Sequence, residues 1–469
     1  MQIYRHIASF IALVALCSCT PNLYEPEVRV PDAYTTLSGI DNDTLGIDSK
    51  WWLLFGDARL DSLQNRALLA NRDINSAMSS VAEALYAMKG VRSSHYPELD
   101  FDIDIEAEDE PTEGRINSFT LSRTVSWKLP LSALWREQNR AAQAELLAAD
   151  WAAYGMLLTI TSEVAKCYYK LAGYRDQYNI AQRTHTLRQQ SEAIIDSMYC
   201  HGFSSRSDVE RARMLTAEAV ASMATLSEEI AHTEHALAAL VGDTPSHITH
   251  IATTSTISEE ALPPEIAIGQ PADLIFRRPD IMKARRMMDA ARARVGEARF
   301  NRFPALSFVG SGGIYGSSVK EFFRLDKLIW SAASTFMAPA IGFGRLRRAE
   351  KQAIEEYRQA AYAYEECVIN AFKEVEDILS SIASLRIELD ASRTMVAASI
   401  KALELTRALY EGGLNPIGDY IDAERDAYSA QLNLSSSTVA LYEAYIDLIE
   451  AIGGGWSRDT DDDNEATVP

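Results

Sequence analysis

The chain has 469 residues, the length of two to four ordinary domains or of one large chain built on a repeated plan. Its 45 Lys and Arg residues stand against 66 Asp and Glu residues, and the formal net charge of −21 excludes a protein that binds a nucleic-acid backbone, because such proteins carry a basic footprint. Past the N-terminus no apolar run reaches roughly 18 residues, which excludes a helical membrane protein. With only 23 Gly and 15 Pro residues, long uninterrupted elements are expected.

The first residues have the layout of an export signal, a positive charge followed by an apolar core too short to span a bilayer. The segment ends in Leu16-Cys17-Ser18-Cys19, which resembles a bacterial lipobox. We therefore expect a lipoprotein signal peptide over 1–18, acylation of Cys19 with firmly anchoring chains such as palmitate, and a lipid-anchored segment over 19–60. The alternative is a plain cleaved signal with incidental cysteines. No other cofactor is expected.

The remainder of the chain contains an internal repeat. Asp73-Ile74 recurs 207 residues later as Asp280-Ile281, and Gly202-x5-Asp208 recurs 211 residues later as Gly413-x5-Asp419. Because the matches keep their order while the offset drifts so little, the chain is predicted to contain two copies of one unit. We expect a first repeat over 61–246, a connector in the equatorial region over 247–271, a second repeat over 272–456 and an acidic disordered tail over 457–469.

Each repeat changes its apolar period. A helical period ends at Pro97, and a period of two follows, in which apolar residues alternate with acidic ones (Asp100, Asp102, Asp104 and Glu106). After a polar turn stretch, Glu108 to Ser118, the alternation resumes as far as Leu131. Runs of about ten residues have the length of a tilted membrane strand, so we expect membrane hairpins at about 98–131 and 304–340. The alternative is an exposed hairpin with one buried face.

Long helical patterns follow each hairpin. The stretch from Trp135 to Met198 has no proline and is dense in alanine, which lets a helix approach neighbours on both sides. This composition suits a curved wall of helices, whereas a long two-helix coiled coil is the alternative. We expect helices at about 61–93, 135–198 and 208–241 in the first repeat and at about 272–300, 345–411 and 419–452 in the second.

Four membrane strands cannot close a barrel. An open sheet edge in lipid leaves backbone groups unpaired at several kcal/mol each, so the edge must pair with another chain. The strands therefore predict an oligomer, in which the acidic face of the first strand lines a wet lumen. A membrane barrel continued by a long helical tube indicates a conduit.

At this point the sequence resembles a known family, the TolC-like outer-membrane efflux lipoproteins, over essentially residues 19 to 456. The motifs that carry the resemblance are Trp51-Trp52, Phe55-Gly56-Asp57-x2-Leu60, Arg277-Arg278-Pro279-Asp280-Ile281, Phe303-Pro304-x-Leu306, Glu374-Val375-Glu376-Asp377 and Gly453-Gly454-Gly455-Trp456.

The resemblance implies an α+β, mainly α, fold: a homotrimer with a twelve-stranded β-barrel in the outer membrane, a twelve-helix α-barrel in the periplasm and a mixed equatorial domain. It implies three kinds of partner, namely outer-membrane lipid, a periplasmic adaptor and an inner-membrane pump of the resistance-nodulation-division type. Such channels are not enzymes. They are passive exits through which a tripartite efflux system exports drugs or toxic small molecules.

The family closes its periplasmic end with an aperture, and Tyr410-x8-Asp419-x2-Asp422 matches the aperture pattern in spacing. At i and i+3 the two aspartates share a helix face, and three copies would stack two carboxylate rings that raise one another's pKa and attract cations. The alternative is structural: Asp419 caps the helix after Pro416 and Gly418, and Asp422 lies in its first turn.

Asp208 matches an aspartate that in relatives latches the closed state through a basic residue. That basic position falls on Asn415 here, a departure from the family pattern, and Arg206 is a possible substitute. The alternative places Asp208 inside a capping box, Ser207-x2-Glu210. The helix tips, where relatives meet adaptor hairpins or where the chain simply turns, are Gly202, Phe203, Ser204, Ser205, Gly412, Gly413, Leu414 and Asn415.

Three other interpretations compete with a drug-efflux duct. A type I protein-secretion outlet is the nearest of these. A structural or adhesive coiled-coil lipoprotein without a pore predicts heptads without membrane-length alternation, and residues 99–131 weigh against it. A secreted hydrolase is disfavoured because the sequence shows no catalytic constellation. The pairs His232-x2-His235 and His247-x2-His250 have no acidic or cysteine companion at ligand spacing, so no metal site is expected.

Overall fold

The computed structural model describes most of the chain. The described residues are 23–27, 30–31, 50–110, 114–244, 271–316, 328–339 and 342–454. They fall into two compact units: one holds residues up to 29 together with 84–147 and 284–366, and the other holds 30–83, 148–283 and 367 onwards. The expected signal peptide, Cys19, nearly all of the connector and the acidic tail lie outside the described residues.

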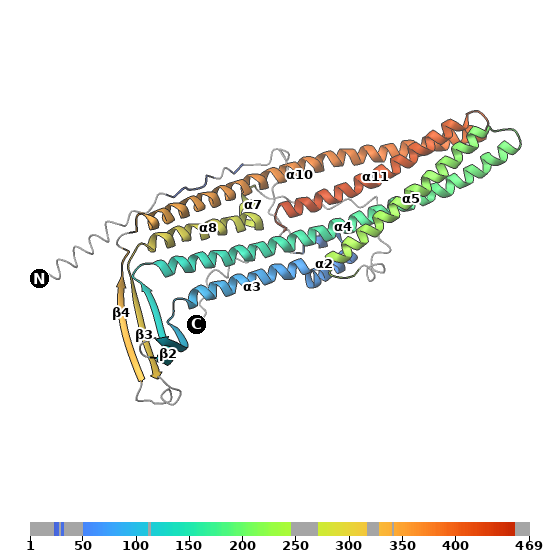
Figure 1. The fold of residues 1–469 in the computed structure, drawn as a ribbon. Helices are drawn as coiled ribbons and strands as arrows, with labels where there is room; N and C mark the ends of the chain where they lie inside the picture. Colours follow the sequence, from blue (N-terminus) through green and yellow to red (C-terminus); the bar gives the residue numbers. More distant parts are fainter. Residues whose placement is uncertain are drawn as a thin grey trace. The chain divides into compact units, whose positions relative to one another are not determined.

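The helices of the two repeats agree in length (Figure 1). α3 (Arg72–Ser93) and α8 (Pro279–Phe300) have 22 residues each, α4 (Leu134–Cys200) and α10 (Arg345–Glu411) have 67 each, and α5 (Arg206–Leu240) and α11 (Ile417–Ala451) have 35 each. The duplication read from the sequence is thus present element by element. None of the helices within the described ranges is long and apolar enough to cross a membrane.

The helix expected over 61–93 is two helices, which corrects the sequence interpretation. α2 (Ala58–Ala70) ends at Asn71, whose backbone is extended, and α3 begins at the next residue. The Asn71 side chain explains the break, because its oxygen accepts from the backbone N–H groups of Asp73 (2.8 Å) and Ile74 (3.1 Å), while its amide donates to the Leu240 carbonyl (2.8 Å). The second repeat is broken at the equivalent place, since α7 (Pro271–Arg277) and α8 are separate helices.

The first unit contains a four-stranded antiparallel sheet. Its strands are β1 (Glu98–Glu110), β2 (Gly114–Pro130), β3 (Ala305–Gly316) and β4 (Leu328–Met337), in the spatial order β1-β2-β3-β4. β2 therefore joins the hairpins of the two repeats. Within the described chain, the outer edges of β1 and β4 pair with no strand.

The first hairpin is longer than expected. The stretch from Glu108 to Ser118 was expected as a polar turn, but the ladder continues through it, with Glu106 opposite Ser118 and Glu110 opposite Gly114. Backbone pairing does not require apolar side chains, so polar composition was a poor guide to where the strands end. The turn itself, 111–113, lies outside the described residues.

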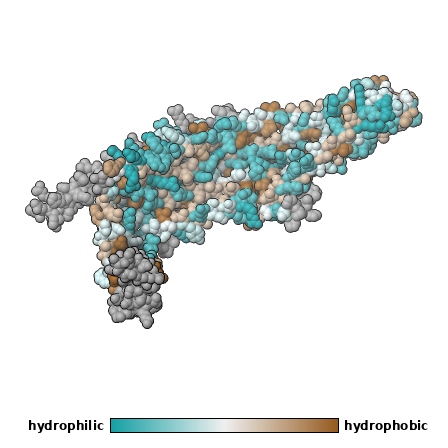
Figure 2. All heavy atoms as spheres, in the orientation of Figure 1, coloured by the Kyte–Doolittle hydropathy of each residue, from teal (hydrophilic) through white to brown (hydrophobic). Residues whose placement is uncertain are grey.

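An aromatic core holds the second unit together. A short 3-10 helix, η1 (Trp51–Phe55), buries Trp51 and Trp52 against α2, α4, α5 and α11. The indole nitrogen of Trp52 donates to Asp61 (3.1 Å), and the rings of Tyr169 on α4 and Tyr442 on α11 stack at 4.3 Å. Figure 2 shows one face of the molecule, where hydrophilic and hydrophobic side chains mix along the helices.

Two of the recognised sequence motifs, the one around Arg278 and the one that begins at Glu374, meet at one side chain of the second unit. Arg278 donates to Asp280 (2.8 Å) and to the Ala451 carbonyl (2.7 Å), and it forms an ion pair with Glu374 (2.7 Å). Burial by itself would raise the pKa of Asp280, but the hydrogen bond and the charge of Arg278 lower it. These motifs are thus explained by packing, and they fix α7, α8, α10 and α11 to one another within the unit.

Candidate functional site

The sheet has one polar and one mainly apolar face. Asp100, Asp102 and Asp104 are exposed and lie opposite Thr124, Ser122 and Thr120 of β2. The polar row continues across the sheet, where Ser311 of β3 hydrogen-bonds Ser331 of β4 (2.7 Å between hydroxyl oxygens). Three of the four expected lumen residues therefore share a polar face. Glu106 pairs through its backbone, and its side chain is outside the described part.

The other face of the sheet carries large apolar side chains that one chain leaves exposed. They include Leu99, Phe101, Ile103, Trp330 and Phe336. Arg123 interrupts this face, as its position in the alternation predicts, and its guanidinium lies 5.2 Å from the centre of the Phe101 ring. A sheet with such a face requires an apolar environment on that side.

The two tips have the same backbone geometry. In the first, the N–H of Gly202 donates to the Tyr199 carbonyl (3.0 Å) and that of Phe203 to the Met198 carbonyl (2.9 Å). Gly413 and Leu414 repeat both bonds in the second tip, to the carbonyls of Tyr410 and Leu409 (2.9 Å each). This pattern is a Schellman motif, which needs a left-handed residue, and the φ angles of Gly202 and Gly413 are +81° and +71°.

Each tip presents an apolar side chain. Phe203 is 79% exposed and Leu414 is 76% exposed, at equivalent positions in the two repeats. Of the remaining tip residues, Ser204 and Asn415 are half-buried, and Ser205, Gly412 and both turn glycines are exposed. The tips are helix-to-helix turns, as the structural alternative required, and they carry exposed hydrophobic residues as well.

Asp208 is part of a capping box, but not of the expected one. α5 begins at Arg206, its N-cap is Ser205, and Ser205 exchanges hydrogen bonds with Asp208 in both directions. The predicted box over Ser207 and Glu210 is wrong, because the helix starts earlier. The Asp208 carboxylate accepts from the Ser205 hydroxyl (2.7 Å), and this hydrogen bond lowers its pKa despite partial burial.

Arg206 does not contact Asp208 in the single chain. It pairs with Glu210 (2.6 Å) and lies over the Tyr199 ring. The cation whose charge acts on Asp208 is Arg211, which also lies close to Gly418 at the start of α11. Neither Asn415 nor Arg206 reproduces the expected latch within one chain.

Tyr410 packs inside the end of the second unit that carries the tips. Its ring stacks on Tyr420 (5.8 Å), and it adjoins the buried cluster of Ile195, Val209, Ala212 and Ile417. Burial, and then the charge of nearby Asp208, raise the pKa of Tyr410. Two of the four predicted aperture residues, Tyr410 and Asp208, are thus neighbours.

Asp419 and Asp422 lie apart from this cluster, on an exposed face of α11. The helix begins at Ile417 behind Pro416, which has no side chain able to cap, so Asp419 is in the first turn and is not the cap expected from the sequence. Asp422 pairs with Arg425 (3.2 Å), whereas Asp419 has no ion-pair partner among the described residues. Asp426 extends the same face by one turn and is also exposed, a repeat spacing that the sequence already contained.

Behind these carboxylates lies a buried ion pair that the sequence did not reveal. Arg188 of α4, 2% exposed, donates to Glu424 of α11, 5% exposed, at 2.8 Å, and to the Leu215 carbonyl of α5 at 2.8 Å. The guanidinium lies over the Tyr428 ring, and Glu218 is 3.5 Å away. Burial raises the pKa of Glu424, although Arg188 opposes the shift. The pair fixes the register of α11 against α4 and α5.

Comparison with known proteins decides the family. Residues 63–243 and 271–454 match the model of the family described as outer membrane efflux protein, which is most of the chain and both repeats. The chain belongs to the outer membrane efflux protein family. Its place is the outer membrane, and the family is one of channel proteins.

Relatives and solved structures agree along nearly the whole chain. The outer membrane protein OprJ of Pseudomonas aeruginosa is 28% identical, with 96% of each chain covered, and the cation efflux system protein CusC of Escherichia coli O6:H1 is 26% identical, with 94% of this chain and 96% of that protein covered. A crystal structure of CusC superposes with a TM-score of 0.82 at 25% identity, covering 94% of this chain and all of that one. The predicted fold class, mainly helical with a four-stranded sheet, is confirmed.

Proposed function

We propose that three copies of this outer membrane efflux protein form a passive exit channel for a tripartite efflux system. The sheets of three chains close a twelve-stranded β-barrel across the outer membrane, and the long helices of the three chains form a twelve-helix periplasmic tube. Family membership and the named relatives support the efflux role over a protein-secretion outlet, since those relatives include a cation efflux protein.

The observation that carries the proposal is the unfinished sheet. The outer edges of β1 and β4 pair with no strand in the described chain, and the sheet exposes large apolar side chains on one face and Asp100, Asp102 and Asp104 on the other. Unpaired edges are costly in lipid, so the β4 edge of one copy pairs with the β1 edge of the next. The apolar face then meets lipid and the acidic face lines the lumen.

The partners follow from the tips and from the family. Phe203 and Leu414 expose apolar side chains beside Schellman turns, and together with the neighbouring tip residues they form the contact surface for a periplasmic adaptor. The adaptor joins the channel to an inner-membrane pump of the resistance-nodulation-division type. In this proposal the pump supplies the transport energy and the channel is passive.

Asp419 and Asp422 form the aperture, with Asp426 one turn further along the same face. Their exposure in the single chain and their i, i+3 and i+7 spacing support this assignment, since three copies around an axis would stack carboxylate rings. Tyr410 and Asp208 support the aperture from behind, through the cluster that joins α10 to α5.

Lipid on Cys19 anchors the channel. Its expected position lies four residues before a segment that is docked on α10: the Tyr24 hydroxyl donates to Glu365 (2.7 Å) and the Tyr357 hydroxyl donates to the Tyr24 carbonyl (2.8 Å). This docking holds residues 23–27 within the same unit as the sheet.

The experiment that tests the proposal measures oligomeric state and conductance together. The purified protein is expected to run as a heat-sensitive trimer in detergent and to conduct in planar bilayers. The Asp419→Ala, Asp422→Ala variant is expected to raise single-channel conductance and to weaken block by divalent cations, because it removes charge from the narrowest ring.

A matched control separates the aperture from general loss of charge. Glu404 and Glu411 are two exposed carboxylates of α10, each paired with a cation on its own helix. Their double alanine variant is expected to leave conductance and block unchanged. A monomer without conductance would refute the channel, and equal responses of the two double variants would refute only the aperture.

A further inference from the structure

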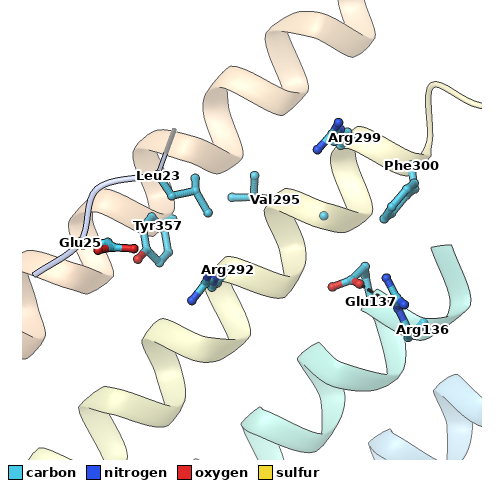
Figure 3. A pocket seen from close by; sticks show the side chains of 10 residues that line it. Leu23, Glu25, Arg136, Glu137, Arg292, Val295, Arg299, Phe300 and Tyr357 are labelled. Atoms are coloured by element: carbon cyan, nitrogen blue, oxygen red, sulfur yellow. Dashed lines mark hydrogen bonds and ion pairs between the residues drawn. The ribbon is translucent and has the colours of Figure 1, made fainter. Parts of the chain in front are cut away.

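A cavity of about 460 Å³ lies wholly within the first unit, between the ends of α4, α8 and α10 that adjoin the sheet (Figure 3). α8 contributes Arg292, Val295, Arg299 and Phe300, while α4 contributes Arg136 and Glu137. The remaining wall is Leu23 and Glu25 of the docked N-terminal segment and Tyr357 of α10. No described feature of the channel uses this cavity.

The cavity is basic in a strongly acidic chain. Together with the depression beside it, it is lined by five arginines and three carboxylates, a local net charge of +2 where the whole chain carries −21. A single carboxylate, Glu137, serves both Arg136 (3.2 Å) and Arg140 (3.1 Å). Within the described residues, the guanidinium groups of Arg292 and Arg299 have no ion-pair or hydrogen-bond partner. Two guanidinium groups in the cavity are therefore free to bind an anion.

The other walls are apolar. Leu23, Val295 and Phe300 line the cavity beside the arginines, and Tyr357 adds a buried ring. Gly296 allows the Glu137 side chain to pack closely against α8 at the cavity wall, because a Cβ there would lie 2.9 Å from that side chain. A ligand that fits both kinds of wall has an anionic group and an apolar part.

The position of the cavity identifies a source of such ligands. Arg136 lies six residues after the last residue of β2, and Arg299 lies six residues before the first residue of β3, so the arginines sit where the strands give way to helices. Leu23 is four residues from the expected lipid anchor at Cys19, a span of at most about 14 Å for extended chain. If the strands cross the bilayer, the cavity lies at its periplasmic surface.

We propose that this cavity binds the phosphate group of an anionic phospholipid of the periplasmic leaflet, with Arg292 and Arg299 as the phosphate ligands. Arginine suits this role, because its planar fork donates two hydrogen bonds to phosphate oxygens. Inorganic phosphate offers the same anionic group but leaves the apolar walls uncovered, whereas a lipid glycerol and the first methylene groups cover them. The inference rests on the proposed function, which places the strands in the membrane.

The test compares three forms of the detergent-extracted protein: wild type, Arg292→Gln with Arg299→Gln, and a control with Arg294→Gln and Arg358→Gln. The control arginines belong to the same unit but pair with Glu145 and Glu355 and do not line the cavity. Each form is incubated with phosphatidylglycerol or phosphatidylcholine, and the lipid retained per chain is counted by native mass spectrometry.

Wild type is expected to retain more phosphatidylglycerol than phosphatidylcholine. The cavity variant is expected to retain about tenfold less phosphatidylglycerol than wild type, since each basic side chain at a membrane surface raises the affinity several-fold. The control is expected to change less than about twofold. Equal losses in the cavity variant and the control, or equal retention of the two lipids by wild type, would overturn the proposal.

A second arm adds millimolar inorganic phosphate to the wild-type complex. Retention of phosphatidylglycerol is expected to persist. Full displacement would assign the cavity to free phosphate and overturn the lipid assignment. The same preparations are tested for trimers and conductance, so a conducting trimer with unchanged lipid retention refutes the cavity alone, while a wild type that neither trimerises nor conducts refutes the channel.

Discussion

The aromatic core around Trp52 and the ion pair of Arg188 with Glu424 lie in the same unit and bridge the same two helices, α4 and α11, with opposite chemistry. Tyr169 and Arg188 are 19 residues apart on α4, which is about 28 Å along the helix. The core is stacked rings, whereas the region toward the tips holds a buried charge pair and only a small apolar cluster.

This difference indicates which part of the unit changes shape at the lower cost in free energy. Apolar burial is non-directional and tolerates small shifts of the helices, but it strongly opposes their separation. A buried ion pair is nearly neutral relative to apolar packing while it is intact and costly once one partner is removed. Helices joined by such a pair can exchange it for water or for another polar partner when they move, which suits the end where the aperture is proposed.

The largest effect is expected in the aromatic core. Trp52→Ala should lower the free energy of unfolding by about 3–5 kcal/mol, because it removes a fully buried indole and its bond to Asp61. Thermal unfolding followed by circular dichroism measures the loss. Conductance of the channels that still assemble should match wild type, and a variant with altered conductance would show that the core is not merely structural.

Breaking the ion pair should cost somewhat less stability but change function. Glu424→Ala is expected to cost about 3 kcal/mol, the low end for a broken buried pair, since Arg188 keeps the Leu215 carbonyl and nearby Glu218. The open state should be observed more often in bilayer recordings, because α11 loses the contact that fixes its register.

A double variant provides the control for this prediction. Arg188→Met with Glu424→Leu replaces the pair by apolar side chains and should recover most of the stability. Stability that stays as low as in the single variant would mean that the ion pair is not the source of the effect.

The smallest effect is expected at the cap of α5. Asp208→Asn should weaken the first turn by about 1 kcal/mol at neutral pH, seen as faster hydrogen exchange at the start of α5. The folded-state pKa of Asp208 is lowered, so its contribution is present above the unfolded pKa and is lost as the pH falls through the folded value. The difference between wild type and variant should therefore vanish in acid, and a difference that persists there would exclude the carboxylate as its cause.

Much of this fold follows from local sequence. The absence of proline from 134–200 predicts one long helix, and the alternation from Leu99 onwards predicts strands with the correct faces. The helix break at Asn71 was also written in the sequence, as Asn71-Arg72-Asp73, a cap followed by an acidic first turn. It was missed because the apolar period continues across it, from Leu68 to Ile74.

Other features could not be read from the chain. Arg188 and Glu424 are 236 residues apart, and nothing local to either indicates a buried partner. The docking of Tyr24 on Glu365 of α10 spans 341 residues, and the cavity beside it exists only once α4, α8 and α10 are packed. Contacts between distant segments depend on the packing of helices, which periodicity does not specify.

The two helix starts behind the tips have a geometric consequence for any partner. α5 begins with a reciprocal serine–aspartate lock, whereas α11 begins behind a proline with no side-chain cap. In the proposed trimer, turns followed by a capped helix start would alternate with turns followed by an uncapped one. A partner built from identical repeats would then meet two kinds of helix start, and its neighbouring repeats would have to bind by unequal contacts.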